Sequence, residues 1–167
     1  MLSRTADSLF WLSRYVERAE NTARIIDAAA RLSALPAGYG GETNEWESAL
    51  IASGAMDRFK ALGLEANAAN AIEFLAFSAD NPSSIRNCLE VARFNARAVR
   101  TALTIEMWEI INGAWLELKN YGGAGGRMSR QQLNDFLAFV TRTSLAFDGS
   151  AYRTMLRNDA YAFSRLG

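Results

Sequence analysis

DSLFWLSRYVERAENTARIIDAAARL, residues 7–32, is the stretch that decides the fold. Its apolar and small residues recur at alternating steps of three and four positions, which places them along one side of a helix about 40 Å long. A polar group lies away from that side and includes Arg14, Glu17 and Arg18. The pattern predicts a long amphipathic helix with one buried seam, formed by Leu9, Leu12, Val16, Ala19, Ala23, Ile26 and Ala30.

The length and composition of the chain fit one folded domain. It has 167 residues, of which 50% are apolar, and this is enough for a single core and too many for a disordered chain. Its 18 basic and 18 acidic residues cancel, so no overall charge draws it to nucleic acid or to an anionic membrane. We therefore expect a single α-helical domain over residues 1–167, with neither nucleic acid nor a membrane as a partner.

The scarcity of two residue types excludes whole classes of chemistry. The chain has no histidine, which removes Ser-His-Asp and Cys-His nucleophile systems and histidine-ligated zinc. Di-iron bundles, which usually use Glu-x-x-His pairs, are disfavoured for the same reason. The one cysteine, Cys88, cannot form an internal disulfide and falls near the inner seam of a helix, where we expect a small core residue. The sequence thus predicts no metal and no cofactor.

The sequence also lacks the patterns of a membrane span and of a secretory leader. No run of about eighteen apolar residues is present. Asp7, Arg14 and Glu17 interrupt any apolar stretch near the N-terminus. A cytoplasmic location is the resulting expectation.

Hydrophobic spacing and turn residues predict further helices along the chain. A second long helix carries a seam spaced by fours and threes, and Thr104 breaks or bends the path after it. Ser129 caps the last full helix, which Asp148 and Gly149 close. No stretch shows sustained strand alternation, so the expected fold is an all-α multi-helix bundle with two long heptad-patterned helices. The helices are expected over residues 7–32, from 44 onward, and over 56–62, 65–77, 85–103, 105–119 and 130–147.

A glycine-rich segment at residues 122–126 is predicted to be a flexible loop. Its glycines invite comparison with a phosphate-binding loop. However, the segment lacks the GxxxxGK[ST] pattern and follows a helix instead of a strand, so a phosphate-binding role is disfavoured.

The two ends of the chain resemble each other. With a shift of 154 positions, MLSRTADSLFWLS at residues 1–13 aligns with MLRNDAYAFSRLG at residues 155–167, and four of the aligned pairs are identical. The counterpart of Arg14 would be the next residue after the chain stops, where a second Arg-x-x-Glu-Arg helix would begin. We expect the chain to be the N-terminal portion of a longer domain that contains this unit twice. The alternative is an ordinary short helix with a coincidental likeness.

Two blocks of the sequence are similar to a known family. LSRTADSLFWLSRYVERAENTARIID, residues 2–27, contains the pair Glu17-Arg18, and DNPSSIRNCLEVARFNARAVRTALTIEMWEIIN spans residues 80–112. Both blocks resemble the bacterial alpha-E family, an all-helical domain named for its Glu-Arg motif. Members are usually longer than this chain and contain a second Glu-Arg helix, which agrees with the interrupted repeat.

The resemblance implies partners and names no reaction. Members of the family look like companions of circularly permuted ATP-grasp enzymes and of transglutaminase-like peptidases, in peptide or amino-acid ligation and modification. An ATP-grasp ligase and a transglutaminase-like protein are therefore the partners that the resemblance implies. The family has no established activity.

The polar side of the first helix carries the main candidate binding residues. Glu17 shares a stripe with Arg14 and Asn21, and a carboxylate between arginines keeps its charged form, which suits binding better than acid catalysis. Arg18 follows Arg14 by four positions, so the two could form a double-donor clamp on a carboxylate or a phosphate. The alternative is that these residues form salt bridges to another helix and fix the packing.

A second polar set lies in the block at residues 80–112. Arg93, Asn95 and Arg97 precede Glu106 on the following predicted helix. One interpretation joins Arg93 and Arg97 to Glu17 across a helix pair, which would make a polar site in the bundle. The alternative is a solvent-exposed basic face.

Three functions remain open on these observations. The favoured one is a non-catalytic accessory or interaction domain. The second is an enzyme that acts on an amino-acid or peptide substrate through Glu17 and the arginines. The third is a structural bundle that forms a homodimer through an uncovered apolar seam.

Overall fold

The computed structural model describes residues 3–35, 44–121 and 128–167, and within these ranges the chain is helical with no strand. The all-α multi-helix fold is confirmed. The glycine-rich loop predicted at residues 122–126 lies outside the described residues. The elements are α1 (Ser3–Leu32), α2 (Glu45–Ala52), α3 (Met56–Ala61), α4 (Ala68–Ala76), α5 (Ile85–Ala98), the short 3-10 helix η1 (Arg100–Ala102), α6 (Ile105–Leu118), α7 (Arg130–Thr154) and α8 (Asp159–Leu166).

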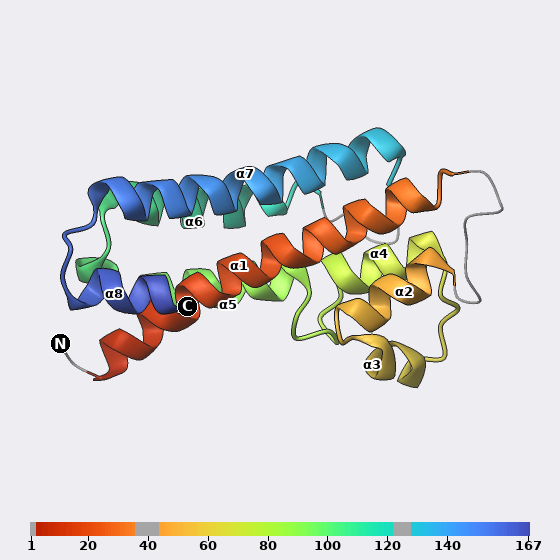
Figure 1. Ribbon diagram of the computed structural model, residues 1–167, viewed down its shortest axis with the longest axis horizontal. Helices are drawn as coiled ribbons and strands as arrows, with labels where there is room; N and C mark the ends of the chain where they lie inside the picture. Colours follow the sequence, from red (N-terminus) through yellow and green to blue (C-terminus); the bar gives the residue numbers. More distant parts are fainter. Residues whose placement is uncertain (1–2, 36–43, 122–127) are drawn as a thin grey trace.

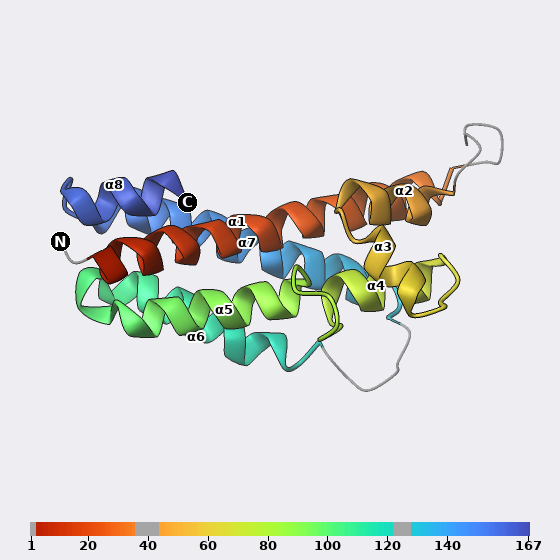
Figure 2. The ribbon, with the colours of Figure 1, turned by 90° about the horizontal axis from the view of Figure 1, so that it is seen from below.

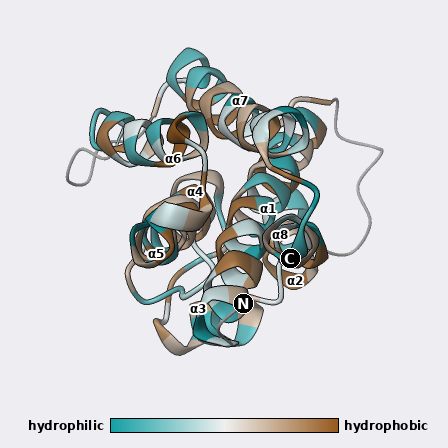
Figure 3. Ribbon diagram, turned by 90° about the vertical axis from the view of Figure 1, so that its left-hand side faces the viewer, coloured by the Kyte–Doolittle hydropathy of each residue, from teal (hydrophilic) through white to brown (hydrophobic). Residues whose placement is uncertain are grey.

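Four long helices form the body of the bundle. Helix α1 packs against α5 and α7, and α6 packs against the same two helices, so the four close into a ring (Figures 1 and 2). The short helices α2 and α4 lie against the C-terminal half of α1, whereas α8 lies beside its N-terminal half. Viewed along the bundle, α7 turns hydrophilic residues outward (Figure 3). Helix α1 is thus the element that contacts both ends of the molecule.

The seam of α1 is buried as its spacing predicts. Six of the seven seam residues are buried, with Leu9, Leu12 and Ile26 completely inaccessible to solvent, and Ala30 is half-buried. Two hydrophobic clusters share this seam, one around the C-terminal half of α1 and one around its N-terminal half. Tyr15 packs against both clusters, so it lies where the two halves of the core meet.

Side-chain caps fix where several helices begin. Ser84, Thr104 and Ser129 accept hydrogen bonds from backbone N–H groups three residues further on, at 3.2, 3.4 and 3.2 Å. At Ser129 the cap is reciprocal, because Gln132 Oε1 accepts a bond of 2.8 Å from the Ser129 N–H. The predicted cap of the last long helix is confirmed.

Helix α5 is shorter than the predicted segment 85–103. It ends at Ala98, and the turn of η1 leads to an extended backbone at Thr104, which caps α6. An N-cap residue needs non-helical backbone angles, so Thr104 cannot both cap α6 and continue α5. The chain therefore breaks before Thr104, and α6 packs back along α5.

Helix α7 is longer than the predicted segment 130–147. Asp148 and Gly149 do not close it, because Gly149 lacks the positive φ of a C-terminal glycine cap and the helix continues to Thr154. Phe147 and Ala151 are buried in the core on either side of the glycine, and this packing accounts for the extension. Leu145, although apolar and on the same helix, is 61% exposed.

Helix α8 is attached to the bundle through both apolar and polar contacts, and its Ala160 and Tyr161 pack against the core cluster around the N-terminal half of α1. Ser164, its one buried residue, forms a hydrogen bond of 2.8 Å between its Oγ and that of Ser13 on α1. Arg165 forms an ion pair with Asp148 of α7. Leu166 is 70% exposed, whereas Leu12, the residue with which it aligns in the terminal repeat, is completely buried. At this aligned pair the two ends of the chain therefore differ in burial.

We predict that Leu12→Ala lowers the free energy of unfolding by about 2–5 kcal/mol, because it leaves a cavity in the core. Leu145→Ala is the matched control on an exposed face and is expected to change it by less than about 0.5 kcal/mol. Urea denaturation followed by circular dichroism measures both. Equal losses for the two variants would contradict the burial pattern.

Candidate functional site

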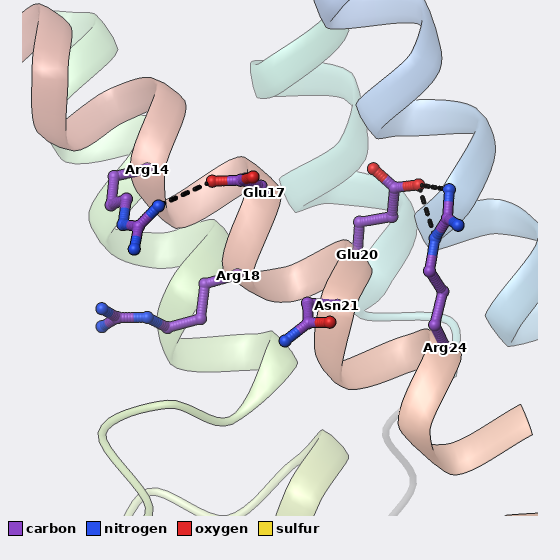
Figure 4. A pocket seen from close by; sticks show the side chains of 6 residues that line it. All are labelled: Arg14, Glu17, Arg18, Glu20, Asn21 and Arg24. Carbon is purple, nitrogen blue, oxygen red and sulfur yellow. Dashed lines mark hydrogen bonds and ion pairs between the residues drawn. The ribbon is translucent and has the colours of Figure 1, made fainter. Parts of the chain in front are cut away.

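The polar face of α1 lines an open groove of ≈ 480 Å³. Its lining side chains all come from α1, over three successive turns of the helix (Figure 4). Four of the predicted binding residues are therefore brought together, and two further residues join them. The lining residues are Arg14, Glu17, Arg18, Glu20, Asn21 and Arg24.

Glu17 points into solvent and pairs within its own helix. Its Oε2 lies 2.9 Å from Arg14 Nη1, and the two side chains are 63% and 48% exposed. An exposed ion pair of this kind contributes about 0–1 kcal/mol to stability. The ion pair of Glu17 therefore does not hold α1 to a neighbouring helix, which removes the packing alternative for this residue.

Arg18 lies over an aromatic ring on the same face. Its guanidinium carbon is 5.2 Å from the centroid of Tyr15, a distance at which the positive charge is attracted to the ring. Figure 4 shows the Arg18 side chain extending away from the pair of Arg14 and Glu17. Because Tyr15 is anchored in both core clusters, the platform under Arg18 is fixed.

Glu20, which sequence reasoning missed, is the glutamate that joins two helices. Its Oε2 accepts a bond of 2.6 Å from Ser144 Oγ on α7, and its Oε1 lies 2.5 Å from Arg24 Nη2. The Glu20 side chain is only 14% exposed. Position 20 follows Val16 by four and precedes Ala23 by three, so it borders the seam, and this spacing is the sequence feature that could have identified it.

The surroundings of Glu20 favour its charged form. Burial alone would raise the pKa of this carboxyl, but the hydrogen bond from Ser144 and then the bond and charge of Arg24 outweigh it. The pKa of Glu20 is therefore lowered from the ordinary value of 4.5. A carboxylate held in this way acts as a structural anion.

The second predicted set lies elsewhere on the molecule. Arg93 Nε donates a bond of 2.9 Å to Asn112 Oδ1 and so links α5 to α6, while Asn95 bonds to the Val91 carbonyl of its own helix. Arg97 and Glu106 are exposed. None of these four residues is among the lining residues of the described groove, so the structure does not bring the two sets together.

Cys88, on α5, is completely buried in the hydrophobic core. Burial raises the pKa of its thiol to about 12, and the positive charge of Arg18 offsets only part of that effect. The thiolate is the nucleophilic form of cysteine, so Cys88 is an inert core residue at neutral pH.

Residues 3–35, 44–121 and 128–167 contain no group of three or more Cys, Asp and Glu side chains placed to hold a metal ion. No helix in the same ranges combines the length and apolar character needed to cross a bilayer.

Comparison with known proteins identifies the family. The profile of Alpha-E, described as a predicted alpha-helical domain with a conserved ER motif, matches residues 1–167. The chain belongs to the Alpha-E family. No curated protein and no solved structure matches it. The sequence of this Alpha-E domain contains one Glu-Arg pair, Glu17-Arg18, and both residues line the groove on α1.

We predict that Glu20→Ala lowers the free energy of unfolding of the Alpha-E domain by about 1–2 kcal/mol, because it removes a charged bond to Ser144 and leaves Arg24 without its partner. Glu17→Ala is the matched control and is expected to cost less than about 0.5 kcal/mol. Thermal and urea unfolding measure both variants. An equal effect of the two would contradict the separate roles assigned to them.

Glu20 also predicts an acid dependence of stability. Because its folded pKa is lowered, its contribution is fully present above the unfolded value near 4.5 and is lost as the pH falls through the lower folded value. Glu20→Gln should flatten the stability profile in this acid range, and Ser144→Ala should reduce its slope. Urea midpoints measured between pH 3 and 6 give the profile. An unchanged acid slope in Glu20→Gln would show that other groups control it.

Proposed function

We propose that this Alpha-E domain is a non-catalytic interaction domain and that the groove on α1 is its docking surface. Its partners, taken from the family resemblance, are an ATP-grasp ligase and a transglutaminase-like protein that ligate or modify peptides or amino acids in the cytoplasm. In this proposal the domain uses no cofactor. It binds neither nucleic acid nor a membrane.

The observation that supports this proposal is that two glutamates on α1 have different partners. Glu20 is held by Ser144 of α7 and ties two helices together, whereas Glu17 pairs only within its own helix and faces solvent. The family is described by a conserved ER motif, and Glu17-Arg18 is the Glu-Arg pair of this chain. A motif whose ion pair contributes little to packing is best accounted for by contact with another molecule.

The chemistry of the groove favours binding over catalysis. Arg14 lies 2.9 Å from Glu17, and Glu20 is bound by Ser144 and Arg24, so both carboxylates of the groove already have partners within the protein. A general acid or base needs a pKa near the working pH, and the pKa of Glu20 is moved away from it. The buried thiol of Cys88 does not line the groove.

A homodimer is the second candidate, and it rests on a different surface. Large apolar side chains stay exposed near the end of α7 and at the end of α8, namely Tyr152, Leu156 and Leu166. Exposed apolar side chains of this size are candidates for a contact face. Light scattering of the free chain tests this candidate, because a monomeric mass would exclude it.

We predict that a tagged Alpha-E domain retains an ATP-grasp ligase of the kind that the family resemblance implies, when the two are co-expressed and purified. The double variant Glu17→Ala with Arg18→Ala should reduce the retained ligase at least about tenfold, because it removes two charged groups from the docking surface. Quantitative gel analysis of the eluted complex measures the loss.

The matched control is the double variant Asp27→Ala with Arg31→Ala. These two residues form an exposed ion pair of 2.8 Å on the same helix and do not line the groove. This control should retain the ligase as the unmodified chain does, and circular dichroism should show both variants folded. Equal retention by all three proteins, or retention by none, would overturn the proposed docking surface.

A further inference from the structure

We propose that Arg18 is the anchor of a carboxylate-binding site and that the ligand is an acidic side chain of an extended peptide lying in the groove on α1. This inference rests on the proposed docking function and adds the chemical class of what docks. The inference rests on Arg18, which is the one arginine among the groove residues that has no carboxylate partner among the ion pairs of the described residues.

The three arginines of the groove differ in how they are paired. Arg14 is matched by Glu17 at 2.9 Å, and Arg24 is matched by Glu20 at 2.5 Å. Among the ion pairs of the described residues, none includes Arg18. Arg18 therefore keeps its charge and its fork of N–H donors for a ligand from outside.

Arg18 is also held in position before any ligand arrives. The ring of Tyr15 lies 5.2 Å from the guanidinium carbon and is itself packed in the core. Attraction to the ring holds the planar guanidinium in place, and such a group binds a carboxylate through two parallel hydrogen bonds. Less side-chain freedom is then lost on binding, which favours affinity.

The charges of the groove select a carboxylate over a phosphate. Three arginines and two glutamates leave one net positive charge, which matches the single charge of a carboxylate. A phosphate carries up to two negative charges and would meet the exposed carboxylate of Glu17, one residue before the anchor. Glu17 therefore acts against doubly charged ligands.

The dimensions of the groove suit a short extended peptide. From Arg14 to Arg24 the helix rises about 15 Å, which is the length of about four residues of extended chain. Asn21, one turn after Arg18, is exposed and offers both a donor and an acceptor, as a peptide backbone requires. We therefore assign the acidic side chain to Arg18 and the neighbouring backbone to Asn21.

The test uses the acetylated, amidated tetrapeptide Ala-Glu-Ala-Ala and its Ala-Gln-Ala-Ala analogue, titrated into the folded chain and followed by NMR. The glutamate peptide should shift the Arg18 Nε–Hε signal and the amides of residues 14–24 in a saturable way. The glutamine analogue should bind at least about tenfold more weakly, because it lacks the charge. Equal binding of the two peptides, or no binding, would overturn the assignment.

Variants and a competing anion separate the site from general charge attraction. Arg18→Ala should abolish the shifts, Arg18→Lys should weaken binding because it loses the planar fork, and the exposed control Arg31→Ala should bind normally. Inorganic phosphate should bind more weakly than the peptide. Normal peptide binding by Arg18→Ala, or tighter binding of phosphate, would overturn the proposal.

The two proposals fail in different ways. Loss of the ligase in the Glu17 and Arg18 double variant, with no binding of the tetrapeptide, would keep the docking surface and reject the carboxylate anchor. Binding of the tetrapeptide at Arg18, with ligase retention unchanged in that variant, would keep the anchor and reject the docking role proposed for the groove.

Discussion

Burial of the seam of α1 is the constraint on which the rest of the structure depends, because this one helix contacts both halves of the core. Leu9, Leu12 and Ile26 are completely buried, and each contributes on the order of 1.5–3 kcal/mol relative to an exposed position. Between them Ala19 and Ala23 have small side chains, which lets neighbouring helices approach closely. Helix α1 contacts five other helices, and the side of α1 that they leave uncovered faces solvent. The groove lies on this uncovered side.

That division explains why two glutamates three residues apart have different roles. Glu20 borders the seam, so Ser144 of α7 lies within hydrogen-bond distance of it. Because this hydrogen bond is partly buried, its loss would leave a poorly solvated carboxylate without a partner and would lower stability. Glu17 lies farther around the helix and is left with Arg14 in water. The same helix therefore provides one carboxylate that stabilises the fold and one that is free to contact another molecule, without any change in residue type.

The sequence alone predicted the features that depend on residues close together in the chain. Helical spacing predicted the seam of α1, and local capping chemistry predicted the start of α7 at Ser129. The features that the sequence did not predict depend on contacts between helices that are distant in the chain. Gly149 stays helical because the residues on either side of it, Phe147 and Ala151, are buried in the core. The role of Glu20 depends on Ser144, which is 124 residues away. Arg93 finds its partner on the next helix at Asn112, which directs it away from the predicted joint site.

The shallow attachment of α8 gives this helix a different local stability from the rest of the bundle. Its one fully buried residue is Ser164, and its apolar Ala160 and Tyr161 are only partly buried, so separation of α8 from α1 exposes less apolar surface than separation of the long helices. Its backbone amides should exchange with deuterium well before those in the middle of α1, which open only when both core clusters separate. Limited proteolysis should likewise begin between α7 and α8, and the native body of four long helices should survive the first cut.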